Sequence, residues 1–296
     1  MRNPTVGVVG LGYVGLPLSV GLARAGVSVV GFDTNETVTA GLDAGNSHIQ
    51  DVSEAQVREA VESGARFTSN AKAFGGLDAY IICVPTPLAA NGHPDLTFVE
   101  EAAQLVGVKV REGAVVVLES TTYPGTTEEV VRPILEQRSG LVAGEDFCLS
   151  YSPERIDPGN SRFGVNNTPK VVGGLLSCCR DRASEIYGHL GAEIVGAKGL
   201  REAGLSKLLE NTYRHVNIAL VNEMARFCRA LDIDLHDAIS CAATKPFGYQ
   251  AFYPGPGVGG HCIPIDPNYL SYRVRAELGY PFRFVELAQE INASMP

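Results

Sequence analysis

Short apolar runs alternate with amphipathic stretches through the first two thirds of the chain. The apolar runs predict β-strands over residues 5–9, 27–32, 79–84, 114–119, 147–151 and 170–173. Between several of these runs, apolar residues recur at helical spacing and predict helices over 18–25, 98–110 and 128–137. Such alternation is typical of a largely parallel sheet covered by helices on both faces, so we predict an α/β fold here.

From about Glu202 to Leu231 the pattern changes to that of one long amphipathic helix. Its apolar positions recur three and four residues apart, at Leu205, Leu208, Leu209, Tyr213, Val216, Leu220, Met224 and Phe227. More helices are predicted over 233–243, 269–278 and 284–291. We therefore expect two domains, residues 1–199 with the sheet and 200–296 with the long connecting helix and an all-α domain. The length of the helix also indicates a dimer seam, and we expect a homodimer.

The stretch Pro254–Asp266 crowds glycines and prolines around His261 and Cys262. Glycine permits positive φ and close approach of a ligand, while proline stiffens the chain, and both are costly inside helices and strands. We therefore predict a rigid loop that holds a ligand. Composition alone leaves open a surface loop with a chance cysteine.

The first predicted strand leads into Gly10-Leu11-Gly12-Tyr13-Val14-Gly15, and the second ends at Asp33. In such a unit the glycines allow a tight turn, approach of a pyrophosphate and helix–strand packing, while the helix N-terminus favours the phosphates. Asp33 suits a ribose diol, and its charge would repel a 2′-phosphate. The unit predicts a Rossmann-like, doubly wound domain that binds NAD. A structural turn in an unrelated α/β domain is the alternative.

Unusual polar residues follow three of the predicted strands, in the segments Pro85–Pro87, Glu119–Gly125 and Ser152–Arg155. Ligands of parallel sheets bind beyond the carboxyl ends of the strands. We therefore expect Thr121 and Glu154 to be site residues, although each segment is also compatible with simple turn chemistry.

Lys207 and Asn211 lie four residues apart in the long predicted helix and therefore share a face. A lysine and an amide that point at one spot predict an oxyanion site. The alternative is an ordinary solvated patch.

The 296 residues carry 24 Lys+Arg against 33 Asp+Glu, a formal net charge of -9 that argues against nucleic-acid binding driven by overall charge. The 7 cysteines and 6 histidines form no metal-ligand spacing, so we expect no metal site. The odd number of cysteines fits a reducing compartment. With no signal peptide and no apolar run of bilayer length, we expect a cytoplasmic protein without a membrane partner.

Taken in order, these motifs resemble the UDP-glucose/GDP-mannose dehydrogenase family, the UDP-sugar 6-dehydrogenases. The resemblance rests on Gly10-x-Gly12-Tyr13-Val14-Gly15, Ser120-Thr121, Ser152-Pro153-Glu154, Lys207-x-x-x-Asn211 and Gly259-Gly260-x-Cys262-x-Pro264-x-Asp266, and it covers essentially the whole chain. The stretches Ser152–Gly159, Thr244–Tyr249 and Tyr253–Gly257 look most like the UDP-N-acetylglucosamine 6-dehydrogenase branch. The family implies a role in polysaccharide biosynthesis.

The resemblance implies a four-electron oxidation of the C6 alcohol of a UDP-hexose to a carboxylate, with two NAD+ used in succession. Cys262 would trap the intermediate aldehyde as a thiohemiacetal, and loss of a hydride would give a thioester. A nearby positive charge lowers the pKa of a thiol and makes it a better nucleophile, and Lys207 and His261 are candidates for supplying it.

Further roles follow from the matched motifs. Asp266 and Thr121 would hold and activate water, and Glu154 would assist thioester hydrolysis. Lys207 and Asn211 would stabilise the developing oxyanion. The implied cofactor-binding residues are Gly10, Gly12, Tyr13, Val14, Gly15, Asp33, Pro85, Thr86 and Thr121. The implied substrate-binding residues are Glu154, Arg155, Lys207, Asn211, Phe252, Tyr253, Gly257, Gly259 and Cys262.

Two departures from the family pattern leave alternatives open. His261 and Ile265 stand where UDP-glucose members usually carry Ser and Lys, which weakens UDP-glucose as the substrate. We expect UDP-N-acetylglucosamine from the stretches named above, with UDP-N-acetylmannosamine and UDP-glucose as alternatives. Family members also continue into a C-terminal UDP-binding domain, which we expect this chain to lack. A noncatalytic NAD-binding and dimerisation module is therefore a second interpretation. A simple hydroxyacid dehydrogenase also joins a dinucleotide fold to helices, but it gives no reason for the Cys262–Asp266 loop.

Overall fold

The computed structural model describes residues 3–89, 92–156, 162–260 and 262–295, and of Cys262 it describes the backbone alone. The chain divides into two compact units. The first comprises Met1–Pro87 and Asp95–Lys207, and the second comprises Leu88–Pro94 and Leu208–Pro296. The domain boundary after residue 199 stays a sequence-based proposal.

The first unit is built on a sheet that has eight strands in the described part of the chain, in the order β3-β2-β1-β4-β5-β6-β7-β8. The strands are β1 (Thr5–Val9), β2 (Ser28–Phe32), β3 (Arg66–Thr68), β4 (Ala79–Ile82), β5 (Val115–Leu118), β6 (Cys148–Tyr151), β7 (Lys170–Gly174) and β8 (Ile194–Gly196). Neighbouring strands are parallel except β6 and β7, which are antiparallel. The start of β7 therefore lies at the edge where the parallel strands end.

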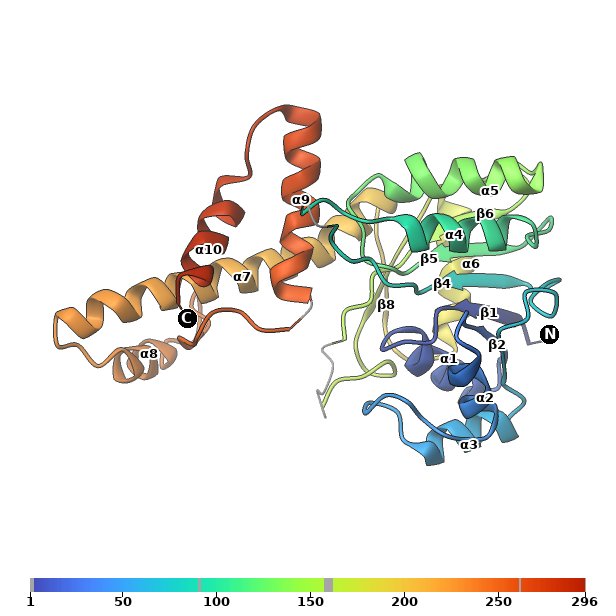
Figure 1. Cartoon of the computed structure of the whole chain (residues 1–296), viewed down its shortest axis with the longest axis horizontal. Coiled ribbons are helices and arrows are strands. Elements are labelled where there is room, and N and C mark those ends of the chain that lie inside the picture. The colour runs from blue at the N-terminus through green and yellow to red at the C-terminus, as the bar shows by residue number, and fades with distance from the viewer. Residues whose placement is uncertain (1–2, 90–91, 157–161, 261, 296) are drawn as a thin grey trace. The chain divides into compact units, whose positions relative to one another are not determined.

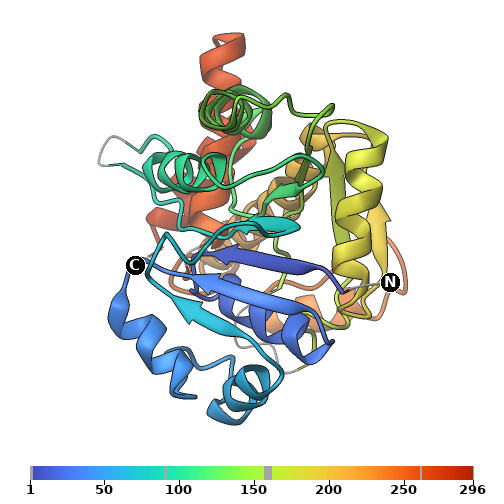
Figure 2. The same ribbon diagram turned by 90° about the vertical axis from the view of Figure 1, so that its right-hand side faces the viewer.

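Helices cover both faces of this sheet (Figure 2). They are α1 (Gly15–Arg24), α2 (Glu36–Asp43), α3 (Glu54–Glu62), α4 (Thr97–Gly107), α5 (Arg132–Ser139), which continues from the π-helical turn η1 (Thr127–Val131), and α6 (Ser177–Gly188). In β5, Val115 and Val117 belong to the buried cluster that includes residues of α1, α3 and α6, whereas Val116 and Leu118 belong to the cluster that includes residues of α4 and α5. Alternate residues of a strand face opposite sides of the sheet, and helices cover both sides. Both sets of residues are therefore buried, which explains the continuous apolar run. The predicted doubly wound α/β fold is confirmed.

The second unit is helical (Figure 1). Its helices are α7 (Leu200–Ala230), whose first residues belong to the first unit, α8 (Leu235–Ala243), α9 (Cys262–Leu278) and α10 (Arg283–Ala293). Asp234 caps α8 by accepting a hydrogen bond of 3.1 Å from the Asp237 N–H. The predicted long helix followed by an all-α part is confirmed. Among the described residues, none of the helices combines the length and hydropathy needed to cross a bilayer.

One sequence prediction needs correction. The stretch from Cys262 to Asp266, predicted as loop, is the beginning of α9. Pro264 lies in the first turn, where the backbone N–H groups have no intrahelical acceptor, so its missing N–H is tolerated. Gly257 (φ 106°) and Gly260 (φ 84°) have the left-handed backbone that glycine favours, so the loop prediction holds for the part before the helix.

Candidate active site

The glycine loop after β1 has the shape of a phosphate-binding turn. A Cβ added at Gly10 (φ +89°) would lie 2.7 Å from the Cys83 carbonyl oxygen, and one at Gly15 would lie 1.8 Å from the Gly10 carbonyl oxygen. A Cβ at Gly12 would meet no described atom within 4 Å. The first and third glycines are therefore required by the packing of the chain itself, whereas the second faces open space where a ligand's phosphates fit.

Two further features of the first unit fit a dinucleotide. Asp33, at the end of β2, accepts hydrogen bonds from the N–H of Leu11 (3.0 Å) and from the N–H of Asn35 (2.9 Å), which fix its carboxylate beside the glycine loop. The residue before α1, Val14, has an apolar side chain that cannot cap the helix. In the first turn the Leu16 N–H donates to the Gly12 carbonyl oxygen at 3.1 Å and Pro17 has no N–H, so an anion here is favoured by the helix dipole rather than by a set of open N–H groups. These residues fit NAD, and a carboxylate at this position suits its adenosine ribose rather than a 2′-phosphate.

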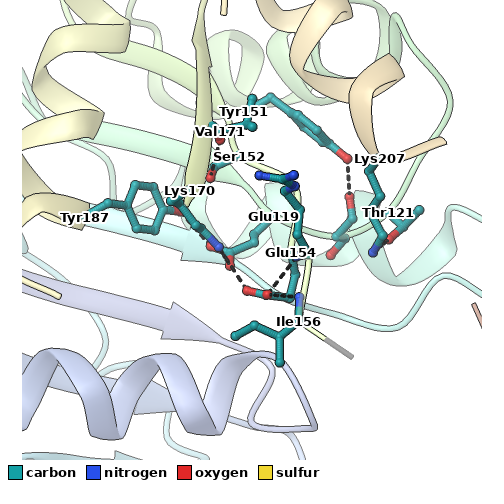
Figure 3. Close-up of polar contacts among 12 residues, drawn as sticks. Glu119, Thr121, Tyr151, Ser152, Glu154, Ile156, Lys170, Val171, Tyr187 and Lys207 are labelled. Atoms are coloured by element: carbon teal, nitrogen blue, oxygen red, sulfur yellow. Dashed lines mark hydrogen bonds and ion pairs between the residues drawn. The ribbon is translucent and has the colours of Figure 1, made fainter. Parts of the chain in front are cut away.

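Thr121 and Lys207, predicted from two separate motifs, lie in contact in the first unit (Figure 3). Lys207 Nζ donates a hydrogen bond of 2.6 Å to Thr121 Oγ1, and Lys207 is only 9% exposed. The segment that carries Thr121 is fixed by Ser120, whose hydroxyl donates to the Val84 carbonyl at 2.8 Å. A buried ammonium group is therefore held at the hydroxyl that follows β5.

Asn211 and Asp266 form the corresponding pair of the second unit. Asn211 Nδ2, one turn after Lys207 on α7, donates a hydrogen bond of 2.6 Å to Asp266 Oδ2 in the first turns of α9. Both side chains are buried. This contact joins two residues that the sequence assigned to the reaction, and it orients the Asp266 carboxylate.

Glu154 belongs to a group of buried polar side chains that we call the charge array: Glu119, Glu154, Lys170 and Tyr187 (Figure 3). Lys170 Nζ donates to Glu119 Oε1 and, at 3.0 Å, to Glu154 Oε2. The Tyr187 hydroxyl donates to Glu119 Oε2 at 2.6 Å. Glu154 Oε1 accepts hydrogen bonds of 2.7 Å from the N–H groups of Arg155 and Ile156.

The pKa values of the two carboxyl groups in the charge array are shifted in opposite directions. Burial raises the pKa of Glu119 from 4.5 to about 7, although Lys170 opposes the shift. Burial also raises the pKa of Glu154, but the Lys170 charge and the Ile156 N–H outweigh it and lower the pKa to about 2. The two carboxylates hold the pKa of Lys170 above its ordinary value against the effect of burial. Glu154 is therefore an anion throughout the neutral range, which suits an electrostatic role better than proton transfer.

The described part of the Pro254–Gly260 loop is fixed by amide side chains. The Gly255 N–H donates to Asn222 Oδ1 at 2.9 Å, and Asn222 Nδ2 donates to Asn292 Oδ1 at 2.9 Å. A Cβ added at Gly257 would lie 3.0 Å from the Asn292 carbonyl oxygen, whereas one at Gly259 would meet no described atom within 4 Å. His261 and the side chain of Cys262 lie outside the described residues, so the position of the thiol stays a prediction.

The other predicted site residues have these surroundings. The rings of Phe252 and Tyr213 make an edge contact with centroids 5.8 Å apart, and Tyr253 stacks on His236 at 6.0 Å. Arg155 Nη1 donates to the Pro169 carbonyl at 2.8 Å. Tyr13 and Pro85 are exposed, and Thr86, which follows β4 with Pro85, is half-buried. In the ranges that the structure describes, we find no group of three or more His, Cys, Asp or Glu residues that could hold a metal ion.

Sequence reasoning missed three members of the charge array, Glu119, Lys170 and Tyr187. A signal was present for two of them, because Glu119 closes one predicted strand and Lys170 opens another. Charged residues at the ends of buried strands are expected to need partners. For Tyr187, inside a helix, we see no comparable signal.

The fold and the glycine loop with Asp33 are those of a domain that binds a dinucleotide such as NAD. Residues 4–191 match the NAD binding domain of the UDP-glucose/GDP-mannose dehydrogenase family, and residues 201–294 match the central domain of the same family. The chain belongs to this family and is an NAD-dependent nucleotide-sugar 6-dehydrogenase.

Named relatives agree on the class and differ in the sugar. The chain is 38% identical over 296 residues to UDP-N-acetyl-D-glucosamine 6-dehydrogenase of Pseudomonas aeruginosa, covering 100% of the chain and 69% of that protein. It is 36% identical over 304 residues to UDP-N-acetyl-D-mannosamine dehydrogenase of Escherichia coli K12, covering 100% and 70%. The solved structure of UDP-D-ManNAc dehydrogenase from Pyrococcus horikoshii has a TM-score of 0.92 at 34% identity, covering 99% of the chain and 69% of that structure.

Proposed function

We propose that this dehydrogenase oxidises the C6 hydroxyl of UDP-N-acetylglucosamine to a carboxylate, a four-electron reaction with two NAD+. The observation that carries the proposal is the hydrogen bond of 2.6 Å from Lys207 Nζ to Thr121 Oγ1. It brings a buried cation to the sheet edge at which parallel α/β folds bind ligands. A cation in that place stabilises negative charge that develops on an oxygen.

In the first oxidation the C6 alcohol loses its hydroxyl proton and a hydride and becomes an aldehyde. The glycine loop and Asp33 would hold NAD+, whose chemistry when bound is to take up the hydride released from C6 in each of the two oxidations. Lys207 would donate to the developing alkoxide, and Thr121 would hold the ammonium group in place through the contact described above. Asn211, one turn further on α7, supplies an amide donor on the same helix face.

The second oxidation requires a nucleophile, and Cys262 would supply it. The thiolate adds to C6 of the aldehyde, forms the C–S bond, and the former carbonyl oxygen takes up a proton to give a thiohemiacetal. Loss of the second hydride and of the hydroxyl proton leaves a thioester. Water held by Asp266 and Thr121 then attacks the thioester carbon, the C–S bond breaks, and the carboxylate and the free thiolate result, with the two protons of the water released to solvent. Glu154, fixed as an anion, would assist this hydrolysis.

The choice of sugar rests on the stretches that resemble the UDP-N-acetylglucosamine branch and on the relative of that name, while relatives named for UDP-N-acetylmannosamine support the alternative. NADH formation with UDP-N-acetylglucosamine, UDP-N-acetylmannosamine and UDP-glucose tests the choice. We expect the highest kcat/KM with UDP-N-acetylglucosamine. A higher value with either of the other two would reject the sugar assignment but leave the chemistry standing.

We also propose that the protein is a homodimer that pairs through α7. Apolar side chains on this helix are largely exposed although they recur at helical spacing: Leu205, Leu209, Tyr213, Leu220 and Phe227. An apolar stripe of this kind is stabilised when it is covered by a second copy. Light scattering should therefore give twice the chain mass of 31.4 kDa, and Leu220→Glu should lower it. A wild-type monomer at micromolar concentration would contradict the proposal.

A further inference from the structure

The charge array is larger than the proposed reaction requires. Glu154 has a role in that reaction, whereas Glu119, Lys170 and Tyr187 do not. They come from the end of β5, the start of β7 and α6, and their side chains are buried. Buried charges are costly unless they are paired and hydrogen-bonded, so an array of this size must serve stability or must hold Glu154.

Counting charges shows which carboxyl group keeps a proton. Two carboxylates against one ammonium group would leave a net charge of one negative unit in a buried place. Glu154 accepts hydrogen bonds from two backbone N–H groups and from Lys170, and a backbone N–H can act only as a donor. Glu119 accepts hydrogen bonds from Lys170 and from the Tyr187 hydroxyl, and this hydroxyl can rotate and accept a hydrogen bond from a neutral carboxyl group instead. The proton therefore resides on Glu119, and Glu154 is the anion.

We propose that Lys170 and Glu119 are positioning residues for Glu154: Lys170 fixes the orientation of the Glu154 carboxylate, and Glu119 holds the exchangeable proton of the array. This inference rests on the proposed role of Glu154 in thioester hydrolysis. When Glu119 loses its proton, it competes with Glu154 for the single ammonium group. The hold of Lys170 on Glu154 is then weakened.

Four groups contact Glu119 or interact with its charge, and they come from different elements of the first unit. Lys170 on β7 and Tyr187 on α6 contact it directly, the charge of Glu154, after β6, raises its pKa, and its own charge raises the pKa of Cys83, after β4. Burial and the Glu154 charge raise the pKa of Glu119 to about 7, against the attraction of Lys170. Burial, with Glu119 as the next cause, raises the pKa of Cys83 well above its usual value, so Cys83 stays a neutral thiol.

The first test uses the dependence of stability on pH to determine whether Glu119 holds a proton in the ligand-free protein. Between pH 4.5 and about 7 the folded protein keeps this proton while the unfolded chain releases it, so stability falls as pH rises through that window. For this group alone, the folding equilibrium constant should fall on the order of a hundredfold. Urea unfolding at several pH values should show this loss in wild type, and Glu119→Gln should lack it.

The matched control for this substitution is Glu145→Gln, the same change at an exposed glutamate. It should keep the wild-type dependence of stability on pH, so that the difference between the two variants isolates Glu119. A Glu119→Gln variant whose stability follows the wild-type dependence would overturn the assignment of the proton. This experiment involves neither cofactor nor sugar and is therefore independent of the proposed function.

The second test asks whether Lys170 positions Glu154 for hydrolysis. It measures the burst and the steady state of NADH formation by rapid mixing. Lys170→Met is placed in the Glu119→Gln background, because removing the ammonium group alone would leave two buried carboxylates without a counter-charge. Both oxidations should still give a rapid burst of two NADH per subunit, and the following steady state should be at least tenfold slower than in Glu119→Gln. Glu154→Gln should give the same pattern, and adding it to the double variant should slow the steady state no further.

The possible outcomes separate this inference from the proposed function. The positioning role would be overturned by any of three results. The steady-state rate of the Lys170→Met double variant could equal that of Glu119→Gln, its burst and steady-state rates could fall equally, or the effects of Lys170→Met and Glu154→Gln could be additive. A wild-type enzyme that yields one NADH per sugar would instead reject the proposed function itself. In that case the measurement of Glu119 in the ligand-free protein would still decide where the proton resides.

Discussion

Replacing Cys262 with alanine is expected to abolish formation of the uronic acid while leaving NAD+ binding unchanged. Without the thiolate, the aldehyde forms no thiohemiacetal, and the second hydride has no covalent intermediate from which to leave. The residues that fit the cofactor lie in the first unit, on the glycine loop and directly after β2, and Cys262 is not among them. Product analysis with a UDP-sugar and calorimetry with NAD+ measure the two properties.

A control for this variant is Cys241→Ala, which changes an exposed cysteine on α8. It should retain the wild-type rate and stoichiometry. Uronic acid formation by Cys262→Ala within tenfold of the wild-type rate would show that the thiol is dispensable, and the proposed second oxidation would then be wrong.

Lys207→Ala is expected to have the second largest effect. The ammonium group is buried and bonded to Thr121, so it is preorganised toward an oxygen that becomes negative. Removing one such donor costs about 3–4 kcal/mol of transition-state stabilisation, or about a hundredfold to a thousandfold in kcat. Steady-state NADH formation at saturating sugar measures the loss.

Lys198→Ala removes an exposed lysine shortly before α7 and is the matched control. It should leave kcat unchanged, which separates a specific effect of Lys207 from a general change in charge. A loss of less than tenfold in kcat for Lys207→Ala would exclude Lys207 from stabilising the oxyanion.

The sequence predicted the sheet and the long helix well because burial forces a clear pattern on both. The strand predicted over 5–9 matches β1, and the helix predicted from about 202 to 231 matches α7 closely. Strands buried on both faces appear as continuous apolar runs, and a helix half-exposed to solvent shows a stripe.

Shorter elements escaped prediction although some left signals. We did not predict α2 or α3, yet Asn35 accepts hydrogen bonds from the first turn of α2, and Ser53 with Gln56 forms a capping box on α3. Such capping residues mark helix starts independently of apolar periodicity. Strand β3 has three residues, too few for a pattern.

The site could be predicted residue by residue but not contact by contact. Motifs singled out Thr121 and Lys207, but their hydrogen bond joins positions 86 residues apart, and only the fold brings them together. The contact between Asn211 and Asp266 spans 55 residues in the same way. Lys170 belongs to no functional motif, because its importance depends on the two carboxylates to which it donates hydrogen bonds.

The number of NADH formed per sugar consumed decides whether the enzyme carries out both oxidations. A limiting amount of UDP-N-acetylglucosamine is converted to completion with excess NAD+, and the sugar product is identified by mass spectrometry. We expect two NADH per sugar and the uronic acid as the product. One NADH per sugar with the free C6 aldehyde as the product would contradict this expectation.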